Sequence, residues 1–111
     1  MELKMKKEYQ HLLQSRQLTE DLLLSCIITC NGVIRENAYL EKQWEAYSDF
    51  SDYTGVRLKW SDYRNKIQEA LQRKYEMKKI IALIKTHKAT APKTTVKAVV
   101  ELIDSGDFML I

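Results

Sequence analysis

Apolar residues recur every three or four positions between residues 23 and 47, and this spacing restricts the possible folds more than any other feature. The pattern comprises Leu23, Cys26, Cys30, Val33, Asn37, Leu40, Trp44 and Tyr47. A 3.5-residue repeat kept over about three heptads is typical of a helix that packs one seam against another helix, as in a coiled coil. Thr19 is a suitable N-cap, and Glu20 and Asp21 place acids in the first turn. One helix is therefore predicted over residues 19–47.

The Asn31-Gly32 pair inside this segment allows a second interpretation. Between β-prone residues, Asn-Gly is the strongest short-range signal for a two-residue β-hairpin turn. We favour the helix because the apolar register passes through Gly32 without a shift, and one glycine inside a helix costs only about 1 kcal/mol. The alternative is an α protein with a small β-hairpin at Asn31-Gly32.

A second seam with the same step predicts another long helix over residues 61–88. It comprises Trp60, Tyr63, Ile67, Ala70, Lys74, Met77, Ile81, Ile84 and Lys88. At 1.5 Å per residue both long helices would span roughly 42 Å, and these matched lengths suggest an antiparallel pair. Asn37 and Lys74 are polar positions on the seams. Asn37 either fixes helix register or lies where its seam reaches solvent.

Residues 48–60 are predicted to interrupt the two helices. The segment repeats a Ser-Asp-aromatic triplet, at Ser48-Asp49-Phe50 and Ser51-Asp52-Tyr53, and Ser61-Asp62-Tyr63 follows directly after it. Serine and aspartate favour turns and helix N-caps because their side chains bond nearby backbone groups. The triplets are therefore interpreted as turn chemistry.

Shorter helices are expected at both ends of the chain. Residues 1–16 show mostly helical apolar spacing, and a helix that begins at Thr94 or Thr95 should end at Gly106. The apolar tail from Phe108 to Ile111 should be pinned against the rest of the molecule. The predicted fold class is all-α, a single helical domain over residues 1–111, with two long antiparallel helices, a shorter N-terminal helix and a short C-terminal helix.

The composition supports long regular elements. The chain of 111 residues has 45% hydrophobic residues, only three glycines and one proline. Cys26 and Cys30 lie within one apolar run, which is not a disulfide framework, so reduced thiols and an intracellular (cytoplasmic or nuclear) location are predicted. The first residues lack the continuous apolar core of a signal peptide, and no apolar run is long enough to span a bilayer. Membrane binding is not expected.

Charge is divided along the chain. Residues 1–56 carry six basic and nine acidic residues, residues 57–97 carry twelve basic and three acidic, and the last fourteen residues add three acids. The net charge of +3 therefore conceals a central segment of +9. Such a segment indicates a charged surface that meets an acidic partner, an acidic part of the chain itself, or a nucleic acid.

Catalytic signatures are absent from the sequence. It contains no phosphate-cradling GxxxxGK[ST], no GxGxxG, no HExxH and no GxSxG, and only two histidines, His11 and His87. His87 is interpreted as a surface or helix-end residue. Cys26 and Cys30 would supply two ligands where structural zinc needs four. We therefore expect a non-enzymatic protein with no cofactor, no metal and no small-molecule substrate.

The leading functional prediction is a helical module for protein–protein interaction or assembly, a small adaptor, inhibitor or regulator that self-associates or docks on another protein. Aromatic, basic and tail residues are its candidate contacts: Trp44, Tyr47, Trp60, Tyr63, Arg73, Lys74, Lys78, Lys79, Phe108 and Leu110. The preference for a protein partner rests on the aromatic and seam positions, which call for apolar burial that phosphates cannot supply.

The alternative is a DNA- or RNA-binding regulator that uses residues 57–97. Residues 80–87 and 95–103 resemble a weak helix-turn-helix around the break at 88–94. The candidate contacts are cations: Arg64, Arg73, Lys78, Lys79, Lys85, Lys88, Lys93 and Lys97.

Overall fold

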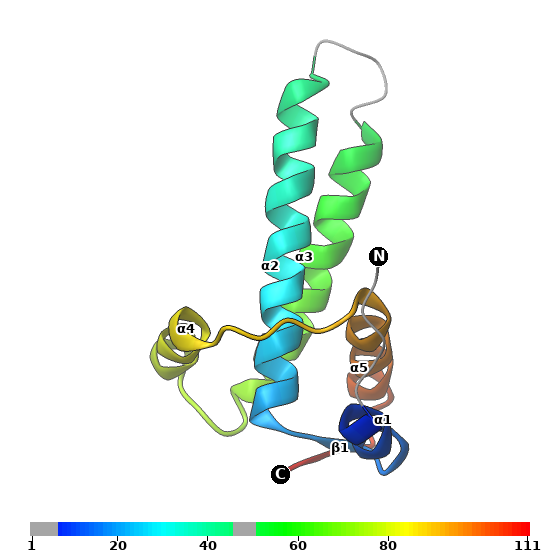
Figure 1. Ribbon diagram of the computed structural model, residues 1–111, viewed down its shortest axis with the longest axis vertical. Coiled ribbons are helices and arrows are strands. Elements are labelled where there is room, and N and C mark those ends of the chain that lie inside the picture. The colour runs from blue at the N-terminus through cyan, green and yellow to red at the C-terminus, as the bar shows by residue number, and fades with distance from the viewer. Residues whose placement is uncertain (1–6, 46–50) are drawn as a thin grey trace.

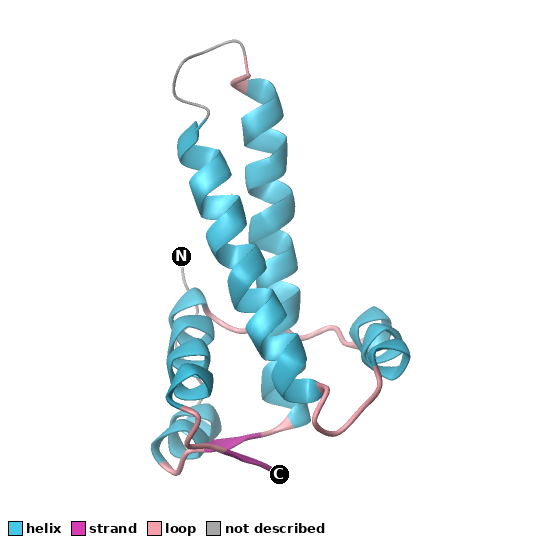
Figure 2. Cartoon of the chain, turned by 180° about the vertical axis from the view of Figure 1, so that it is seen from behind, coloured by secondary structure: helices cyan, strands magenta, loops and turns pink. Residues whose placement is uncertain are grey.

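A computed structural model describes residues 7–45 and 51–111 of the chain. Within these residues it contains α1 (Lys7–Gln14), β1 (Gln17–Leu18), α2 (Glu20–Gln43), α3 (Ser51–Leu71), α4 (Met77–Thr86), α5 (Lys93–Ser105) and β2 (Met109–Leu110). Helix makes up 76% of the described residues, and α2 and α3 run antiparallel, side by side (Figures 1 and 2). The predicted all-α class with two long antiparallel helices is confirmed.

The first long helix begins where the sequence predicts. The Thr19 side chain accepts a hydrogen bond from the backbone N–H of Leu22 at 3.1 Å. The helix passes through Asn31-Gly32 without a break, and Gly106 is the one described glycine with a positive φ. The β-hairpin alternative is wrong, because the buried register on both sides of Gly32 holds the segment helical. The helix ends at Gln43, and Tyr47 lies outside the described residues.

The second half of the fold differs from the prediction. The predicted interruption at 48–60 is wrong from Ser51 onward, because α3 starts there, and Ser48 to Phe50 lie outside the described residues. The predicted helix 61–88 is two helices, separated by a turn at residues 72–76. The Tyr75 side chain in this turn bonds Glu20, the first residue of α2. A straight α3 would therefore run past the start of α2 and expose Ile80, which the turn allows to be buried.

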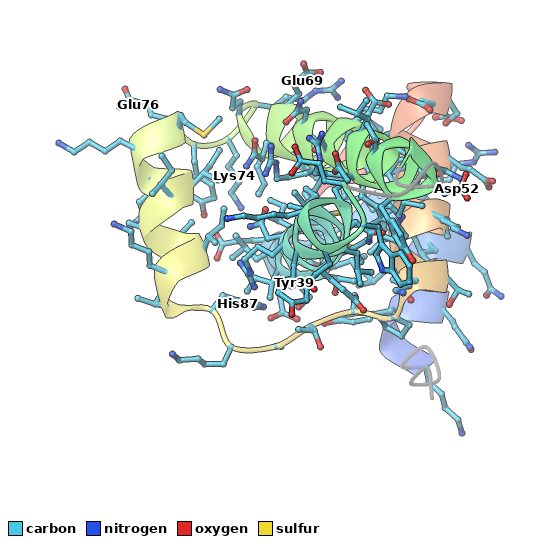
Figure 3. The ribbon with its side chains drawn as sticks, turned by 90° about the horizontal axis from the view of Figure 1, so that it is seen from above. Tyr39, Asp52, Glu69, Lys74, Glu76 and His87 are labelled. Carbon is cyan, nitrogen blue, oxygen red and sulfur yellow. The ribbon has the colours of Figure 1, made fainter. Side chains whose placement is uncertain are left out.

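The core lies around the first half of α2. Its fully buried side chains come from every described element except α1 and β2, and include Leu18, Leu22, Leu23, Ile27, Ile67, Leu71, Ile80, Val96 and Val99. Helices α1 and α5 lie on one side of α2, and α4 lies on the opposite side (Figures 1 and 3). Residues 87–92 cross α2 as an extended linker between α4 and α5.

The segment after α1 pairs with the C-terminal end of the chain. Strand β2 pairs in parallel with β1, and Met109 N–H donates to Arg16 C=O at 2.8 Å while Ile111 N–H donates to Leu18 C=O at 3.0 Å. Gly106 ends α5 with a φ of 75°, as predicted. The apolar tail is pinned as expected. Residues 1–6 of the predicted helix 1–16 lie outside the described residues, and α1 ends at Gln14, two residues before the predicted end.

Candidate functional site

The far ends of α2 and α3 project beyond the rest of the molecule (Figures 1 and 2). We call residues 34–45 and 51–60 the arm. In the body, the two helices meet through apolar side chains such as Cys30 and Ile67, which are fully buried. Arg35 and Glu36 still line a hollow with Pro92 and Lys93, but the outer part of the arm lies clear of α1, α4 and α5 (Figure 1).

The inside of the arm holds polar groups beside the buried Trp60 side chain. Buried Asn37 donates to the Val33 carbonyl of its own helix at 2.9 Å. The Glu41 carboxylate accepts hydrogen bonds from the Arg57 guanidinium and from Thr54 Oγ1, the latter at 2.7 Å. These bonds lower the pKa of Glu41 and raise that of Arg57. A charge-assisted clasp therefore takes the place of an apolar seam at the outer part of the helix pair.

Four large apolar side chains are exposed on the outside of the arm, among charged residues such as Lys42 and Lys59. Tyr39 is 61% exposed, Leu58 56%, Trp44 39% and Val56 38%. Tyr39 lies on the side of α2 that faces away from α3 (Figure 3). Tyr39, Leu40, Gln43 and Trp44 line a shallow hollow of about 370 Å³. The arm therefore combines a polar clasp between its helices with a group of large apolar side chains that solvent reaches.

Three cations of the basic segment are engaged within the molecule. Arg57 pairs with Glu41, Arg64 donates to Asn31 Oδ1 at 3.2 Å, and Lys66 lies 3.1 Å from Asp104 and 3.5 Å from Asp62. The hydrogen bond to Asp104 raises the pKa of Lys66. These side chains hold helices together, so they are poor candidates for ligand binding.

The lysines on and just after α4 differ from Arg57, Arg64 and Lys66 because their side chains face solvent. Lys78, Lys79, Lys85 and Lys88 are exposed, and we call this set the basic face. None of them takes part in a hydrogen bond or ion pair of its side chain within the described residues. Nitrogen-tipped side chains point outward from α4, away from α2 (Figure 3). Ile81, 47% exposed, is the large apolar side chain on this helix that solvent reaches most.

The other predicted cations do not join this face. Lys93 and Lys97 belong to α5, on the opposite side of α2 (Figure 3). The helix-turn-helix prediction is therefore wrong, because the extended linker carries α5 across α2 and the two helices do not pack as one motif. Exposed Arg73 stacks over the Phe108 ring at 4.5 Å, and exposed Lys74 lies 5.6 Å from the centre of the Tyr75 ring.

The predicted aromatic and tail contacts divide between core and surface. Trp60 is buried, and it meets half-buried Tyr63 edge-on with 5.2 Å between ring centres. Phe108 and Leu110 are half-buried against the core. Trp44 is exposed on the arm. Tyr39, Val56 and Leu58 were not predicted as contacts: Tyr39 and Leu58 lie off the seams, and Val56 precedes the first residue of the second seam. An off-seam aromatic such as Tyr39 is the signal that could have revealed them.

A polar cluster joins α1, α2 and the end of α4. Tyr9 Oη donates to Asp21 Oδ2 at 2.7 Å, and burial together with this bond raises the pKa of Tyr9 to about 12. His87, at the C-cap of α4, places Nε2 2.9 Å from Ser25 Oγ and 3.7 Å from Asp21 Oδ1. A Ser-His-Asp triad needs the hydroxyl and the carboxylate on different ring nitrogens. Here both face Nε2, so the cluster lacks that relay and instead links three elements.

The described residues hold no group of three or more His, Cys, Asp or Glu side chains that could bind a metal ion. Cys26 and Cys30 are free and buried, and burial raises the pKa of both thiols, that of Cys30 to about 12. No helix in the described parts of the chain has the length and apolar character to cross a membrane.

Comparison of the chain with family models, curated proteins and solved structures found no match. Its function is therefore argued from the arm and the basic face alone.

Proposed function

We propose that the protein is a non-enzymatic protein–protein interaction module that self-associates through the arm. The observation that carries this proposal is the group of exposed large apolar side chains on the arm. Its interior holds the Glu41–Arg57 clasp, and its exterior presents Tyr39, Leu58 and their apolar neighbours. Single exposed apolar residues are common on protein surfaces. Here four of them gather on one projecting helix pair, an arrangement that burial against another chain would stabilise.

A second copy of the chain is the occupant that the charges favour. Residues 34–45 and 51–60 contain four basic and four acidic residues, so the arm has no net charge. Two arms can approach without net repulsion, whereas residues 77–88 carry four lysines and no acid. Two antiparallel helix pairs laid together form a four-helix arrangement with two-fold symmetry, the commonest kind of homodimer. The arm section of α2 from 34 to 43 is only about 15 Å long, so we expect reversible association.

We further propose an intracellular location, which the cysteines support. Both thiols are buried and unpaired in a chain that has no other cysteine. Proteins of oxidising compartments commonly use cysteines as disulfides, whereas cytosolic and nuclear proteins keep them reduced.

Analytical ultracentrifugation of the full chain tests the proposal. The wild-type mass should rise with concentration from 13.1 kDa toward twice that value. The double variant Tyr39→Ser, Leu58→Ser should stay monomeric with an unchanged helical circular dichroism spectrum. Ile81→Ser is the control, since it removes an exposed apolar side chain outside the arm, and it should associate like the wild type.

Two results would contradict self-association through the arm. One is a wild type that stays monomeric at millimolar concentration. The other is equal weakening of association by Ile81→Ser and by the arm variant, which would indicate general stickiness of exposed apolar groups.

A further inference from the structure

We propose that the basic face, formed by Lys78, Lys79, Lys85 and Lys88, binds the phosphate backbone of double-stranded nucleic acid without sequence preference. This surface is separate from the arm. The inference does not depend on self-association.

The four lysines of the basic face form no side-chain hydrogen bond or ion pair within the described residues. Arg57, Arg64 and Lys66 have partners within the molecule, but the basic-face side chains have none within the described residues. No Asp or Glu occurs between Glu76 and Glu101 in the sequence. An exposed cluster of one sign attracts a ligand of the opposite sign and concentrates it from solution.

Helix α4 is placed so that one of its sides is free to meet a ligand. Ile80 is buried, and Leu83 and Ile84 are half-buried, so one side of the helix packs on the molecule. The opposite side faces outward at the flank of α2, clear of α1 and α5 (Figure 3). Lys78 and Lys85 are seven residues apart, which places them on one side of α4 and separates them by about 10 Å along its axis. The helix is about 15 Å long, and a duplex presents roughly nine charges over that distance.

The composition of the basic face favours nucleic acid over other anionic partners. Protein interfaces are depleted of lysine at their cores and are centred on aromatic or aliphatic anchors, but the basic face offers only Ile81. A helix that lies on a membrane buries a broad apolar face in the lipid, and that face of α4 is occupied by the core. Lysine binds phosphate as a point charge that requires no particular base sequence. A phosphate backbone is the ligand that fits such a surface.

Fluorescence anisotropy with a labelled 20-base-pair duplex tests the inference on the full chain. If all four lysines contact phosphates, the affinity should fall about 100-fold between 50 mM and 200 mM salt, because binding releases condensed counterions. Replacing Lys78, Lys79, Lys85 and Lys88 by Gln should abolish this binding at 50 mM salt. All four positions are exposed, so the circular dichroism spectrum and thermal midpoint should stay close to those of the wild type.

The matched control removes the same number of charges elsewhere. Lys7, Lys42, Lys93 and Lys97 are also exposed, and their replacement by Gln should lower the affinity less than about 10-fold, through the long-range field alone. An equal loss in both quadruple variants would overturn the assignment to α4. So would absence of wild-type binding at 50 mM salt.

Two competing ligands complete the test. Vesicles that contain phosphatidylserine and poly-glutamate should both compete weakly with the duplex at equal charge concentration. Stronger binding to vesicles would assign the face to a membrane surface, and equal binding to poly-glutamate would assign it to an acidic protein. Either result would overturn the inference.

Discussion

Gly32 and Gly106 are the same residue type in opposite backbone conformations. Gly32 lies inside α2, and a Cβ added to it would meet no atom within 4 Å. Gly106 takes a φ of 75°, a left-handed conformation that other residues rarely adopt, and it ends α5. The sequence predicted both roles, since the first glycine interrupts no apolar register and the second follows the last buried turn.

Alanine at these two positions should act in opposite directions. Gly32→Ala should raise the free energy of unfolding by up to about 1 kcal/mol, because alanine restricts the unfolded chain and favours helix. Gly106→Ala should lower it by about 1 kcal/mol, because the left-handed conformation strains a side chain with a Cβ. Urea denaturation of both variants measures the difference. Destabilisation by Gly32→Ala would mean that α2 is not one continuous helix in solution.

At the scale of elements, periodicity predicted which residues are apolar but not which neighbour they contact. Trp60, Ile67 and Ala70 are buried as the second seam requires, but Ile81, on the same seam, is 47% exposed. A repeat continues in sequence whether or not a partner helix continues beside it. The turn after Leu71 depends on where α2 starts beside it, and this placement of one helix against another cannot be inferred from the spacing of apolar residues. The arm was missed for a similar reason, because Trp44 and Leu40 continue the seam after the other helices have ended.

The linker between α4 and α5 depends on one threonine of α2. The Ala91 N–H donates to Thr29 Oγ1 at 2.9 Å, and the same hydroxyl donates to the Ala91 carbonyl at 2.6 Å. Ala91 is buried, so neither backbone group has easy access to water. Thr29 thus fixes the point at which the extended linker crosses α2.

Thr29→Val keeps the shape of this side chain and removes both hydrogen bonds. The free energy of unfolding should fall by about 1–3 kcal/mol, because a buried N–H and C=O lose their partners. Hydrogen exchange of the Ala91 amide should accelerate at the same time. Thr90→Val, at the exposed neighbouring position, should change stability by less than about 0.5 kcal/mol. Equal effects of the two valines would show that the linker is not anchored at Thr29.

At the scale of the whole molecule, charge and topology separate three regions. The neutral arm projects from one end, the basic face lies on one flank, and the paired strands close the opposite end (Figures 1 and 2). The charge partition of the sequence indicated one basic surface over residues 57–97. The fold divides it, because Arg57 and Lys66 bind acids of other helices while α4 and α5 flank opposite sides of α2. Sequence order alone contains no information about such pairings.

The strand pair was the least predictable feature. Each strand has two residues, and the partners Gln17 and Met109 are separated by almost the whole chain. The apolar character of the tail predicted that it would be held against something, but two-residue strands have no periodicity from which to infer a partner. The pairing covers Leu18, which is fully buried.

Deletion of residues 107–111 should therefore destabilise the whole fold without altering the arm. It removes the hydrogen bonds to Arg16 and Leu18, exposes part of Leu18 and takes away half-buried Phe108 and Leu110, a loss of about 2–4 kcal/mol. For a domain of this size that corresponds to a fall of roughly 10–20 °C in the thermal midpoint.

Met109→Ser is the control: its side chain is exposed, the backbone bonds remain, and the midpoint should barely change. Self-association should be retained below the lowered midpoint, since the tail lies at the end of the molecule opposite the arm (Figure 1). A truncated chain with an unchanged midpoint would mean that β1 and β2 contribute nothing to stability. A truncated chain that keeps its fold but no longer associates would move the self-association surface from the arm to the tail.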